Sequence, residues 1–248
     1  LNSNAPSRLQ NILDPEDCLV VLSALTPSHG SSAGVLYANL KMVANICLAL
    51  IAKPTASVIY ASSDAVYPRR PGSINEGACV EPSDTYSAMH QVREVMFREA
   101  YLGPLAILRM TQIYAAHDTH NAYGPCRFIR AAINEQTISL FGEGEDLRDK
   151  IHIDDVTRIF CDCIKRQIDG ILNVTTGRSL SFLEIANIVR AEFSSEIEIK
   201  HDPRQIPVSH RQFDTAMMRG AFPRFSPILQ EEGLPNICKE IKELMGYE

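Results

Sequence analysis

Two hydroxyl side chains in the first half of the chain have the types and spacing for proton transfer at a bound alcohol. Ser63 follows the apolar, β-rich run Ser57–Ser62, and Tyr86 lies at the start of the next predicted helix. The carboxyl end of a parallel strand is where such sheets bind ligands, and the first turn of the following helix can reach the same crevice. Oxidising a secondary alcohol requires a group that orients its oxygen and a base that takes its proton while hydride leaves. We therefore expect Ser63 to orient the oxygen and Tyr86 to transfer the proton.

The residue one helical turn after Tyr86 is His90, where a lysine would supply a permanent positive charge. Tyrosine has a pKa near 10, so a tyrosinate base at neutral pH needs a shift of roughly three pKa units, or about 4 kcal/mol. Histidine has an ordinary pKa near 6.5 and is mostly neutral at pH 7. Arg93, on the same helix face, is the candidate for part of the missing charge. Reduction suits this arrangement better than oxidation, because Tyr86 then donates a proton and needs no lowered pKa.

The elements that would position these residues alternate along the first half of the chain. Apolar, β-rich runs are predicted strands, and amphipathic stretches between them are predicted helices, the second preceded by Ser83 and Asp84 as candidate caps. Buried strands separated by helices are typical of a parallel sheet covered on both faces. We predict a doubly wound α/β fold with strands at Cys18–Ala24, Ser57–Ser62 and Ala106–Met110 and helices at Val35–Ile51 and Thr85–Tyr101.

The second half of the chain predicts a smaller, mixed lobe. A polar loop over Thr111–Gly124 precedes short strands and helices, including a helix after Ser181 whose start has a capping box completed by Glu184. Further predicted elements are helices near Arg127–Asn134, from about Asp154 and near the C-terminus, and strands at TISLF and ILNVTT. We predict a Rossmann-like, dinucleotide-binding part over residues 1–125 and a mainly substrate-binding lobe over residues 126–248, with segments that return to the first part.

The start of the chain departs from the usual dinucleotide-binding pattern. Such a sheet opens with a strand, a GxGxxG-type turn and a helix whose N-terminus takes the pyrophosphate. Here the chain begins at Leu1, and the early glycines of Ser28–Gly34 have another spacing and are predicted to lie in a loop. Loss of a central strand exposes hydrogen-bonding edges. We therefore expect an N-terminally incomplete Rossmann-like sheet.

Six stretches in order together resemble the extended short-chain dehydrogenase/reductase family, specifically the NAD-dependent epimerase/dehydratase group that acts on nucleotide sugars. The resemblance runs from about Cys18 to Gly233. Each stretch alone is a weak signal, and their shared order is a strong one. The stretches are VVLSAL, SSDAVY, LRMTQIY, LFGEGEDLRDKIHIDDV, ILNVTTG and SFLEIA.

The resemblance implies NAD or NADP as the cofactor, a nucleotide sugar as the substrate, and epimerisation or reduction by hydride transfer. It implies Ser63, Tyr86 and His90 as catalytic positions, with His90 where the family has its lysine. The residues that it implies beside the cofactor are Ser23, Ala24, Leu25, Asn39, Ser62, Tyr86, His90 and Met110. Those that it implies beside the substrate are Ser63, Asp64, Gln112 and Arg148, with Arg148 on the substrate phosphates; Arg127 is a further substrate candidate, because its guanidinium group also matches a diphosphate. Many members pair through the helix that carries the tyrosine, so a homodimer is implied as well.

Three other functions stay open. In the family's dehydratases an acid at the position of Asp64 protonates a leaving hydroxyl, usually with a glutamate beside it; here Ala65 follows, and Asp64 could equally cap the local backbone. Without the lysine charge, the chain could be a non-catalytic nucleotide-sugar or dinucleotide-binding protein. It could also be an α/β domain that binds no ligand because it lacks the glycine-rich loop.

Composition disfavours several classes of function. The net charge of −6 over 248 residues is spread without long runs of one sign, which argues against a nucleic-acid or anionic-membrane partner. The apolar run from Cys18 is far shorter than a membrane span. Seven cysteines without a CxxC pair favour free thiols in the cytoplasm. The pair of histidines in His117–His120 has no third ligand at a recognisable spacing, so no metal is expected.

Overall fold

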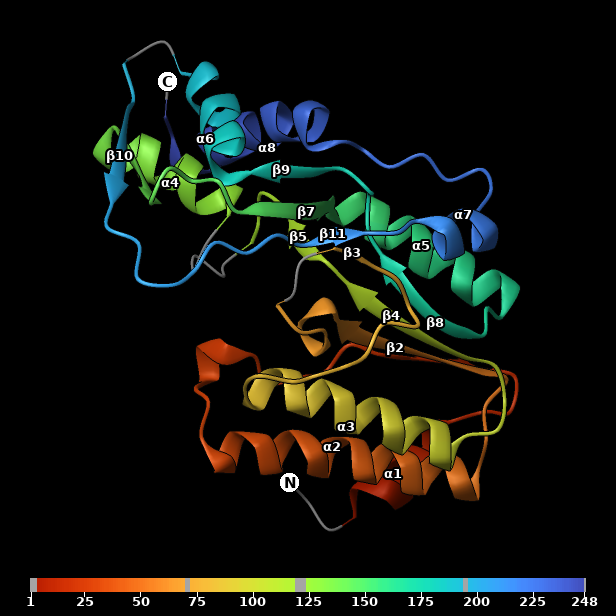
Figure 1. Ribbon diagram of the computed structural model, residues 1–248. Coiled ribbons are helices and arrows are strands. Elements are labelled where there is room, and N and C mark those ends of the chain that lie inside the picture. The colour runs from red at the N-terminus through yellow and green to blue at the C-terminus, as the bar shows by residue number, and fades with distance from the viewer. Residues whose placement is uncertain (1–3, 70–71, 119–123, 194–195, 248) are drawn as a thin grey trace. The chain divides into compact units, whose positions relative to one another are not determined.

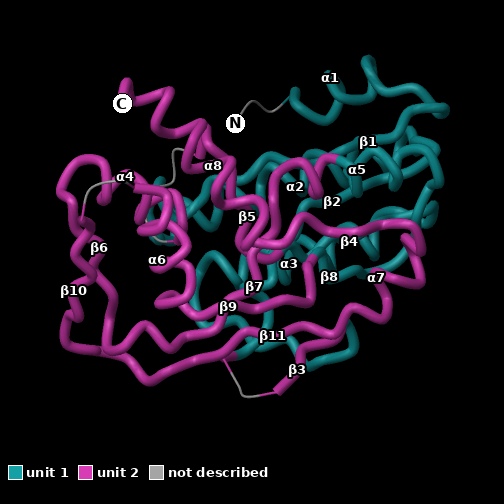
Figure 2. The backbone as a smooth tube through the Cα atoms, turned by 90° about the horizontal axis from the view of Figure 1, so that it is seen from above, with its two compact units in different colours: residues 1–68, 76–110, 158–174 teal, residues 69–75, 111–157, 175–248 magenta. Residues whose placement is uncertain are grey.

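The computed structural model of the chain describes residues 4–69, 72–118, 124–193 and 196–247. Interleaved segments of the sequence form two compact units (Figure 2). Unit 1 consists of residues 1–68, 76–110 and 158–174, and unit 2 of residues 69–75, 111–157 and 175–248. The chain thus leaves unit 1 after Met110, upstream of the predicted division at residue 125, and returns to it for residues 158–174.

Unit 1 is built on a parallel sheet of four strands in the order β1 (Cys18–Val21), β2 (Ser57–Ser63), β4 (Leu105–Met110) and β8 (Gly170–Val174). β2 and β4 are buried along most of their lengths, as expected for parallel strands covered on both faces. The α/β prediction is confirmed. Among the residues that the structure describes, β1 pairs only with β2, so it forms one end of the sheet.

Three helices of unit 1 pack beside this sheet: α1 (Ala5–Ile12), α2 (Ala33–Ala52) and α3 (Thr85–Ala100). α2 and α3 lie side by side along one face of the sheet, and α1 packs against α2 (Figure 1). Apolar side chains of these helices and of the sheet pack together in one core. This core includes Val43 and Leu50 of α2, Tyr60 of β2 and Phe97 of α3. This core fixes the helix that carries Tyr86 against the strand that carries Ser63.

The starts of the helices follow the capping signals in the sequence. The Asp84 carboxylate accepts a hydrogen bond from the Ser87 amide at 2.8 Å, and the Ser87 hydroxyl accepts one from the Asp84 amide at 3.1 Å. The same reciprocal arrangement joins Ser181 and Glu184 at the start of α6 (Phe182–Ala191). Each box satisfies backbone donors that the first helical turn leaves unpaired. The capping box predicted at Ser181 is therefore confirmed.

Helix α2 is the most apolar long element of unit 1. An 18-residue window within it has a mean hydropathy of 1.8, and 28% of that window is buried, so by length and composition the helix could cross a membrane. A core helix of a water-soluble protein passes the same test. The sequence predicts this helix over Val35–Ile51, but Asn39, Lys41 and Asn45 interrupt its apolar residues, so no uninterrupted apolar run marks it as a membrane span. The absence of a membrane partner therefore stays a prediction.

Unit 2 combines short sheets with a helical core. β5 (Gln112–Tyr114), β7 (Leu147–His152) and β9 (Ser179–Ser181) form a three-stranded mixed sheet. Two further pairs are parallel, β6 (Thr137–Phe141) with β10 (Glu198–Asp202), and β3 (Ser73–Ile74) with β11 (Gln212–Phe213). Unit 2 also contains the helices α4 (Pro125–Glu135), α7 (Ala216–Ala221) and α8 (Gln230–Met245). Helix α5 (Ile153–Arg166) begins in unit 2 and continues into unit 1. Unit 1 also contains two 3₁₀ turns, η1 (Pro27–His29) and η2 (Asp64–Val66).

The core of unit 2 lies among α4, α6 and α8. Apolar side chains from the three helices pack together, among them Ile129, Ile185, Val189 and Ile237. Among the described residues, six strands lie outside the predicted strand ranges: β3, β9, β10 and β11, together with β5 inside the predicted loop and β7 inside the stretch LRDKIH. β7 carries buried Asp149 and Lys150, so its sequence shows no apolar alternation.

Candidate active site

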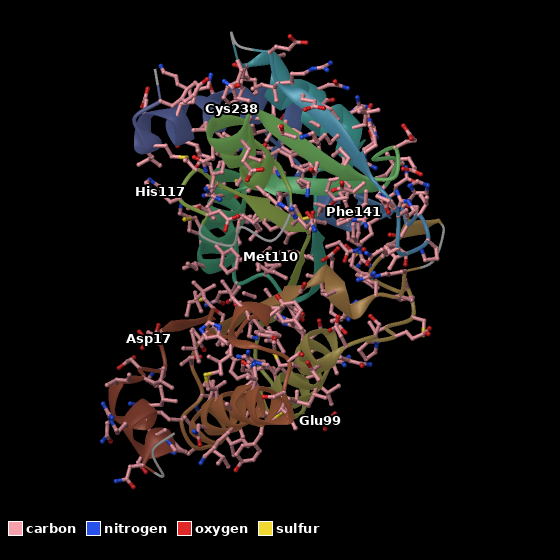
Figure 3. The ribbon with its side chains drawn as sticks, turned by 90° about the vertical axis from the view of Figure 1, so that its left-hand side faces the viewer. Asp17, Glu99, Met110, His117, Phe141 and Cys238 are labelled. Atoms are coloured by element: carbon pink, nitrogen blue, oxygen red, sulfur yellow. The ribbon has the colours of Figure 1, made fainter. Side chains whose placement is uncertain are left out.

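Ser63 is the last residue of β2, at the carboxyl end of the unit 1 sheet. Its half-buried side chain caps the short 3₁₀ turn η2, because its oxygen accepts a hydrogen bond from the Ala65 amide at 3.1 Å. No other hydrogen bond of the Ser63 side chain occurs among the described residues, so its hydroxyl hydrogen is available to donate to a ligand oxygen. Met110, labelled in Figure 3, ends β4 and is the register partner of Ser63 in the parallel pair of β2 and β4.

A buried polar network holds β2, β4 and α3 together beneath Ser63. The Arg109 guanidinium donates to both oxygens of Glu94, at 3.0 and 2.7 Å. Ser62 donates to the same carboxylate at 2.6 Å. All three side chains are almost fully excluded from solvent, where charged groups persist only when paired and hydrogen-bonded. Ser62, predicted to lie beside the cofactor, is thus bonded to Glu94.

The network continues through Tyr67 to β8. Arg109 donates to the Tyr67 hydroxyl at 2.8 Å, and that hydroxyl donates to the Asn173 side-chain oxygen at 2.7 Å. Burial raises the pKa of Tyr67, which keeps the phenol protonated and able to donate. The carboxyl ends of three neighbouring strands are therefore fixed by one set of hydrogen bonds.

Tyr86 lies in the first turn of α3, directly after its capped start. The side chain is half-buried, and its ring packs edge-on against the His90 ring with 4.6 Å between centroids and an interplanar angle of 83°. Spacing of four residues places both rings on one helix face, as the sequence predicts. The structure thus brings the predicted proton-transfer residue and its unusual neighbour into contact.

His90 is buried, with 3% of its surface exposed. Its Nδ1 lies 2.7 Å from the Tyr60 hydroxyl oxygen. Burial, followed by the positive charge of Arg93, lowers the pKa of His90 to about 3. The ring is therefore neutral at physiological pH and supplies no positive charge to Tyr86. Nε2 is buried and has no hydrogen-bond partner among the described residues.

Arg93 places a cation in the interior of unit 1. Its guanidinium donates to the Ser23 carbonyl at 2.8 Å and lies 5.1 Å from the centre of the Tyr60 ring. Burial lowers the pKa of Arg93, while the acidic groups of Tyr60, Cys47 and Tyr86 oppose that shift. Arginine stays protonated in proteins. The guanidinium contacts the Ser23 carbonyl, the Met89 thioether and the face of the Tyr60 ring, and no carboxylate among the described residues forms an ion pair with it.

The loop after β1, predicted to line the cofactor, is held by side chains of α2 and α3. Asn39 of α2 accepts from the Leu25 amide at 2.8 Å and donates to the Leu25 carbonyl at 3.0 Å. Arg93 of α3 binds the carbonyl of Ser23 in the same loop. Ser23 is exposed, and Ala24 and Leu25 are half-buried. Two buried side chains, Asn39 and Arg93, thus fix the position of a loop that is itself partly exposed to solvent.

A dinucleotide fits these residues in part. The exposed loop after β1 and the hydroxyl of Ser63 offer polar groups for a hydroxylated ligand such as a nicotinamide ribose, and the buried, unpaired Nε2 of His90 would add a donor if the side chains that cover it move. Residues 4–17 form α1 and a turn, so no strand, glycine-rich turn and helix for the pyrophosphate precedes β1 among them. The groups present would therefore hold one end of the cofactor.

Unit 2 carries the other predicted substrate residues. Gln112 of β5 is the register partner of Lys150 of β7, and the buried Lys150 ammonium donates to the Gln112 side-chain oxygen. The Lys150 ammonium also lies 5.3 Å from the centre of the Phe182 ring. Lys150 was not among the predicted site residues; the signal in the sequence was a lysine inside LRDKIH, two residues after the predicted Arg148.

Arg148 is held by backbone and hydroxyl groups. It donates to the Ser209 carbonyl at 2.7 Å, to the Ser209 hydroxyl at 3.0 Å and to the Leu147 carbonyl at 2.8 Å. Arg211 forms a parallel bridge with Arg148, so two arginines are adjacent across neighbouring backbones. Arg127 lies exposed in the first turn of α4. Arg211 was missed because it follows a proline-rich stretch that shows no strand pattern.

Two other expectations concern Asp64 and metal ions. Asp64 is half-buried at the start of η2. His120, one of the two histidines considered as metal ligands, lies outside the described residues, while His117 is exposed. Within the described part of the chain, no group of three or more metal-binding side chains occurs.

The sequence as a whole decides the family. The model of the "NAD dependent epimerase/dehydratase family" matches residues 3–174. The chain belongs to this family. The resemblance inferred from its motifs is therefore confirmed.

Two curated relatives match part of the chain. One is a dTDP-D-glucose 4,6-dehydratase of Dictyostelium discoideum, 26% identical over 118 residues, or 46% of this chain and 27% of the relative. The other is a dTDP-L-rhamnose 4-epimerase of Burkholderia thailandensis, 27% identical over 122 residues, or 46% of this chain and 34% of the relative. The matched region is thus about a third or less of each relative's length.

Solved structures share the fold over nearly the whole chain. MoeE5 in complex with UDP-glucose and NAD has a TM-score of 0.84 at 20% identity, covering 98% of this chain and 83% of its own. RMD from Pseudomonas aeruginosa complexed with NADPH has a TM-score of 0.85 at 17% identity, covering 96% and 86%. UDP-glucuronic acid 4-epimerase from Bacillus cereus has a TM-score of 0.83 at 19% identity, covering 98% and 79%. At these identities the likeness concerns the fold.

Proposed function

We propose that the protein catalyses NAD(P)-dependent hydride transfer on a nucleotide sugar, as an epimerase or reductase, with Tyr86 as the proton-transfer residue. The observation that carries the proposal is Tyr86 itself, half-buried in the first turn of α3 and in contact with His90. Membership of the NAD dependent epimerase/dehydratase family supports it. So do the ligands in the names of the structural relatives, which include NAD, NADPH and UDP-glucose.

Ser63 and Tyr86 have different proposed roles at the sugar oxygen. A bound nicotinamide supplies the hydride chemistry. Ser63 orients the oxygen, because its own oxygen is engaged by the Ala65 amide and its hydrogen is left to donate. Tyr86 gives a proton to that oxygen when a carbonyl is reduced, or takes one when an alcohol is oxidised.

The charges around Tyr86 favour the reductive direction. His90 is neutral, so it cannot stabilise a tyrosinate as a lysine would. Arg93 is a cation that interacts electrostatically with Tyr86, and it supplies the positive field that remains. Proton donation by a neutral phenol needs no lowered pKa. We therefore place reduction ahead of epimerisation, which requires both directions at the same site.

Arginines of unit 2 are proposed to bind the nucleotide diphosphate. The guanidinium group matches phosphate oxygens with two parallel N–H donors. Arg148 is the predicted contact, and Arg211 is added because its backbone bridges that of Arg148. Arg127 is a further predicted contact from the first turn of α4, where the helix dipole also favours an anion. Gln112, with Lys150 bonded to it, is the proposed contact for the sugar.

Two alternative functions have support in specific observations. The neutral, buried His90 favours a nucleotide-sugar-binding protein without useful catalysis. The Dictyostelium relative is a 4,6-dehydratase, and Asp64 would be the acid in that reaction. The combination Asp64–Ala65 lacks the neighbouring glutamate, so the dehydratase ranks lower.

Assembly as a homodimer is also part of the proposal. The outer surfaces of α2 and α3 expose large apolar side chains, which mark interaction sites when they gather on a monomer. They are Leu48 and Ile51 of α2 and Val92 and Val95 of α3, exposed by 56%, 63%, 41% and 43%. We call these residues the α2–α3 patch. The family resemblance implies pairing through the helix with the tyrosine, which is α3.

The proposal is tested with a panel of nucleotide sugars. The purified chain is mixed with each sugar and with NADH, NADPH or the oxidised forms, and cofactor absorbance and product are followed; epimerisation without net cofactor change is detected by product analysis. We expect turnover with at least one sugar, and faster reduction than oxidation. Tight sugar-nucleotide binding by calorimetry with no turnover across the panel would favour the binding protein, and production of a 4-keto-6-deoxy sugar would favour the dehydratase.

A further inference from the structure

Tyr60 is the buried hydrogen-bond partner of His90 and was not among the predicted site residues. It lies in the middle of β2, while His90 lies on α3, so the contact joins the sheet to the helix. Its hydroxyl oxygen is 2.7 Å from His90 Nδ1, and both side chains are at least 97% buried. No water or ligand group is needed to explain this bond, because donor and acceptor face each other directly.

The number of unsatisfied groups decides the direction of this hydrogen bond. If the Tyr60 hydroxyl donates to Nδ1, the ring proton sits on Nε2, and one buried donor stays unpaired. If Nδ1–H donates instead, the Tyr60 hydrogen and the Nε2 lone pair are both left unpaired, since neither atom has another partner among the described residues. Buried polar groups without partners are unfavourable, so the first arrangement is preferred.

The surroundings keep both groups neutral. The charged and titratable side chains that act on Tyr60 and His90 are Arg93, Glu94 and Tyr86 of α3, and Cys47 of α2 faces the same Arg93. Arg93 lies over the Tyr60 ring, where a protonated His90 would meet a like charge. Burial disfavours a tyrosinate at Tyr60 and raises its pKa. A neutral phenol beside a neutral imidazole is the consistent pair.

We propose that Tyr60 is a positioning residue that fixes His90 as a neutral imidazole with its proton on Nε2. Position 90 then presents an uncharged hydrogen-bond donor next to Tyr86, in place of the charged donor of a lysine. Because this Nε2–H is buried, a hydroxyl or carbonyl oxygen of a bound ligand would accept a hydrogen bond from it only after the side chains that cover it move. The role toward a cofactor ribose rests on the proposed function, whereas the tautomer is a property of the protein alone.

The test is nuclear magnetic resonance of the full chain, labelled with ¹⁵N-histidine and free of ligand. His90 is assigned by the signal lost in His90→Asn. We expect the pattern of the Nε2–H tautomer, unchanged from about pH 5 to about pH 8, where an ordinary histidine titrates. An Nδ1–H pattern, or a titration near the ordinary histidine pKa, would overturn the proposal.

Two perturbations of Tyr60 test its role. In Tyr60→Phe, we expect the His90 tautomers to mix, while Tyr101→Phe, which removes the hydrogen bond of another buried tyrosine to the Thr55 carbonyl, leaves them unchanged. Labelling with 3-fluorotyrosine keeps the hydroxyl and makes it a stronger donor, so it should shift the His90 Nδ1 resonance even if Tyr60→Phe does not fold. An unchanged Nδ1 resonance would contradict the proposal.

The two proposals fail separately. If the wild-type chain shows the Nε2–H tautomer but neither binds a nicotinamide dinucleotide nor reacts with any nucleotide sugar, the proposed function is wrong and the positioning role of Tyr60 stands. If turnover is found together with an Nδ1–H ring, the function stands and the role of Tyr60 is wrong.

Discussion

At the scale of single residues, the candidate site is characterised by a neutral histidine, His90, and a buried cation, Arg93, on the same helix. Position 90, where the resemblance implies a lysine, holds a histidine that burial keeps neutral, and Arg93 lies one helical turn further along α3. Arg93 also binds the Ser23 carbonyl in the loop after β1. One buried arginine therefore both shapes that loop and sets the field near Tyr86.

The pH dependence of stability follows from His90. Its pKa is about 3 in the folded protein, against an ordinary value near 6.5 for the unfolded chain. Between these values the unfolded state binds the extra proton, so His90 makes the folded state progressively less stable as pH falls below about 6.5. We expect wild type to lose about 1.4 kcal/mol per pH unit relative to His90→Gln in the middle of this range. Urea unfolding at several pH values measures the difference.

The matched control is His117→Gln, which changes an exposed histidine in a loop (Figure 3). Its unfolding free energy should follow that of wild type at every pH. A constant difference between wild type and His90→Gln from pH 6.5 down to about pH 4 would show that His90 is protonated in the folded state.

At the scale of elements, the proposed active-site residues Ser63 and Tyr86 depend on the network of Glu94, Arg109 and Ser62. Helix α3 carries Tyr86 and β2 carries Ser63, and this network joins the two. The ion pair between Arg109 and Glu94 is bidentate and buried, so each of the two charged side chains is stabilised in the interior by the other. Loss of one partner leaves an uncompensated charge in the interior.

Arg109→Met should therefore destabilise the protein strongly. We expect a loss of about 3–5 kcal/mol in the free energy of unfolding, because Glu94 stays buried without its partner. The control is Arg178→Met, which breaks an ion pair with Glu231 whose side chains are 57% and 38% exposed. That change should cost about 1 kcal/mol or less. Equal losses in the two variants, measured by urea unfolding, would contradict the role of the network.

The main elements of unit 1 were predictable because each follows a local pattern. β2, β4, α2 and α3 lie within a few residues of the predicted ranges, and β1 ends earlier, where the exposed Leu22 begins the loop. β5 and β7 were not predictable, because one is very short and the other buries charged residues inside LRDKIH. Their strand character comes from pairing with each other, which no local pattern records.

The candidate site was predictable only in part. Ser63, Tyr86 and His90 followed from spacing and from the family resemblance. Tyr60 looked like an ordinary strand residue, since its role comes from a residue on another element. The same holds for Arg109 and Glu94, whose ion pair joins a strand to a helix. Tertiary contacts of this kind decide the charge states, and they appear only in the structure.

At the scale of the whole molecule, the proposed property is assembly of two chains into a homodimer through the α2–α3 patch. The α2–α3 patch is apolar, and part of it belongs to the helix that carries Tyr86. Pairing through this patch would place both copies of α3 at the interface. Ordering of the site would then depend on protein concentration.

Val95→Arg tests this assembly. A charge at the centre of an apolar interface is strongly unfavourable, so we expect the variant to sediment as a monomer where wild type sediments as a dimer. The control Leu244→Arg places the same charge on α8, at a side chain that is 58% exposed. Analytical ultracentrifugation in which wild type is a monomer, or in which both variants stay dimeric, would contradict the proposed interface.

The most direct test of the proposed function is the turnover of Tyr86→Phe. This change removes the phenol that transfers the proton and keeps the ring that packs against His90. With the nucleotide sugar identified by the panel, we predict that turnover falls about 100- to 10,000-fold, the usual contribution of a general acid or base. Tyr37→Phe, on an exposed tyrosine of α2, should retain wild-type turnover. Turnover of Tyr86→Phe within a few fold of wild type would contradict the assignment of Tyr86 as the proton-transfer residue.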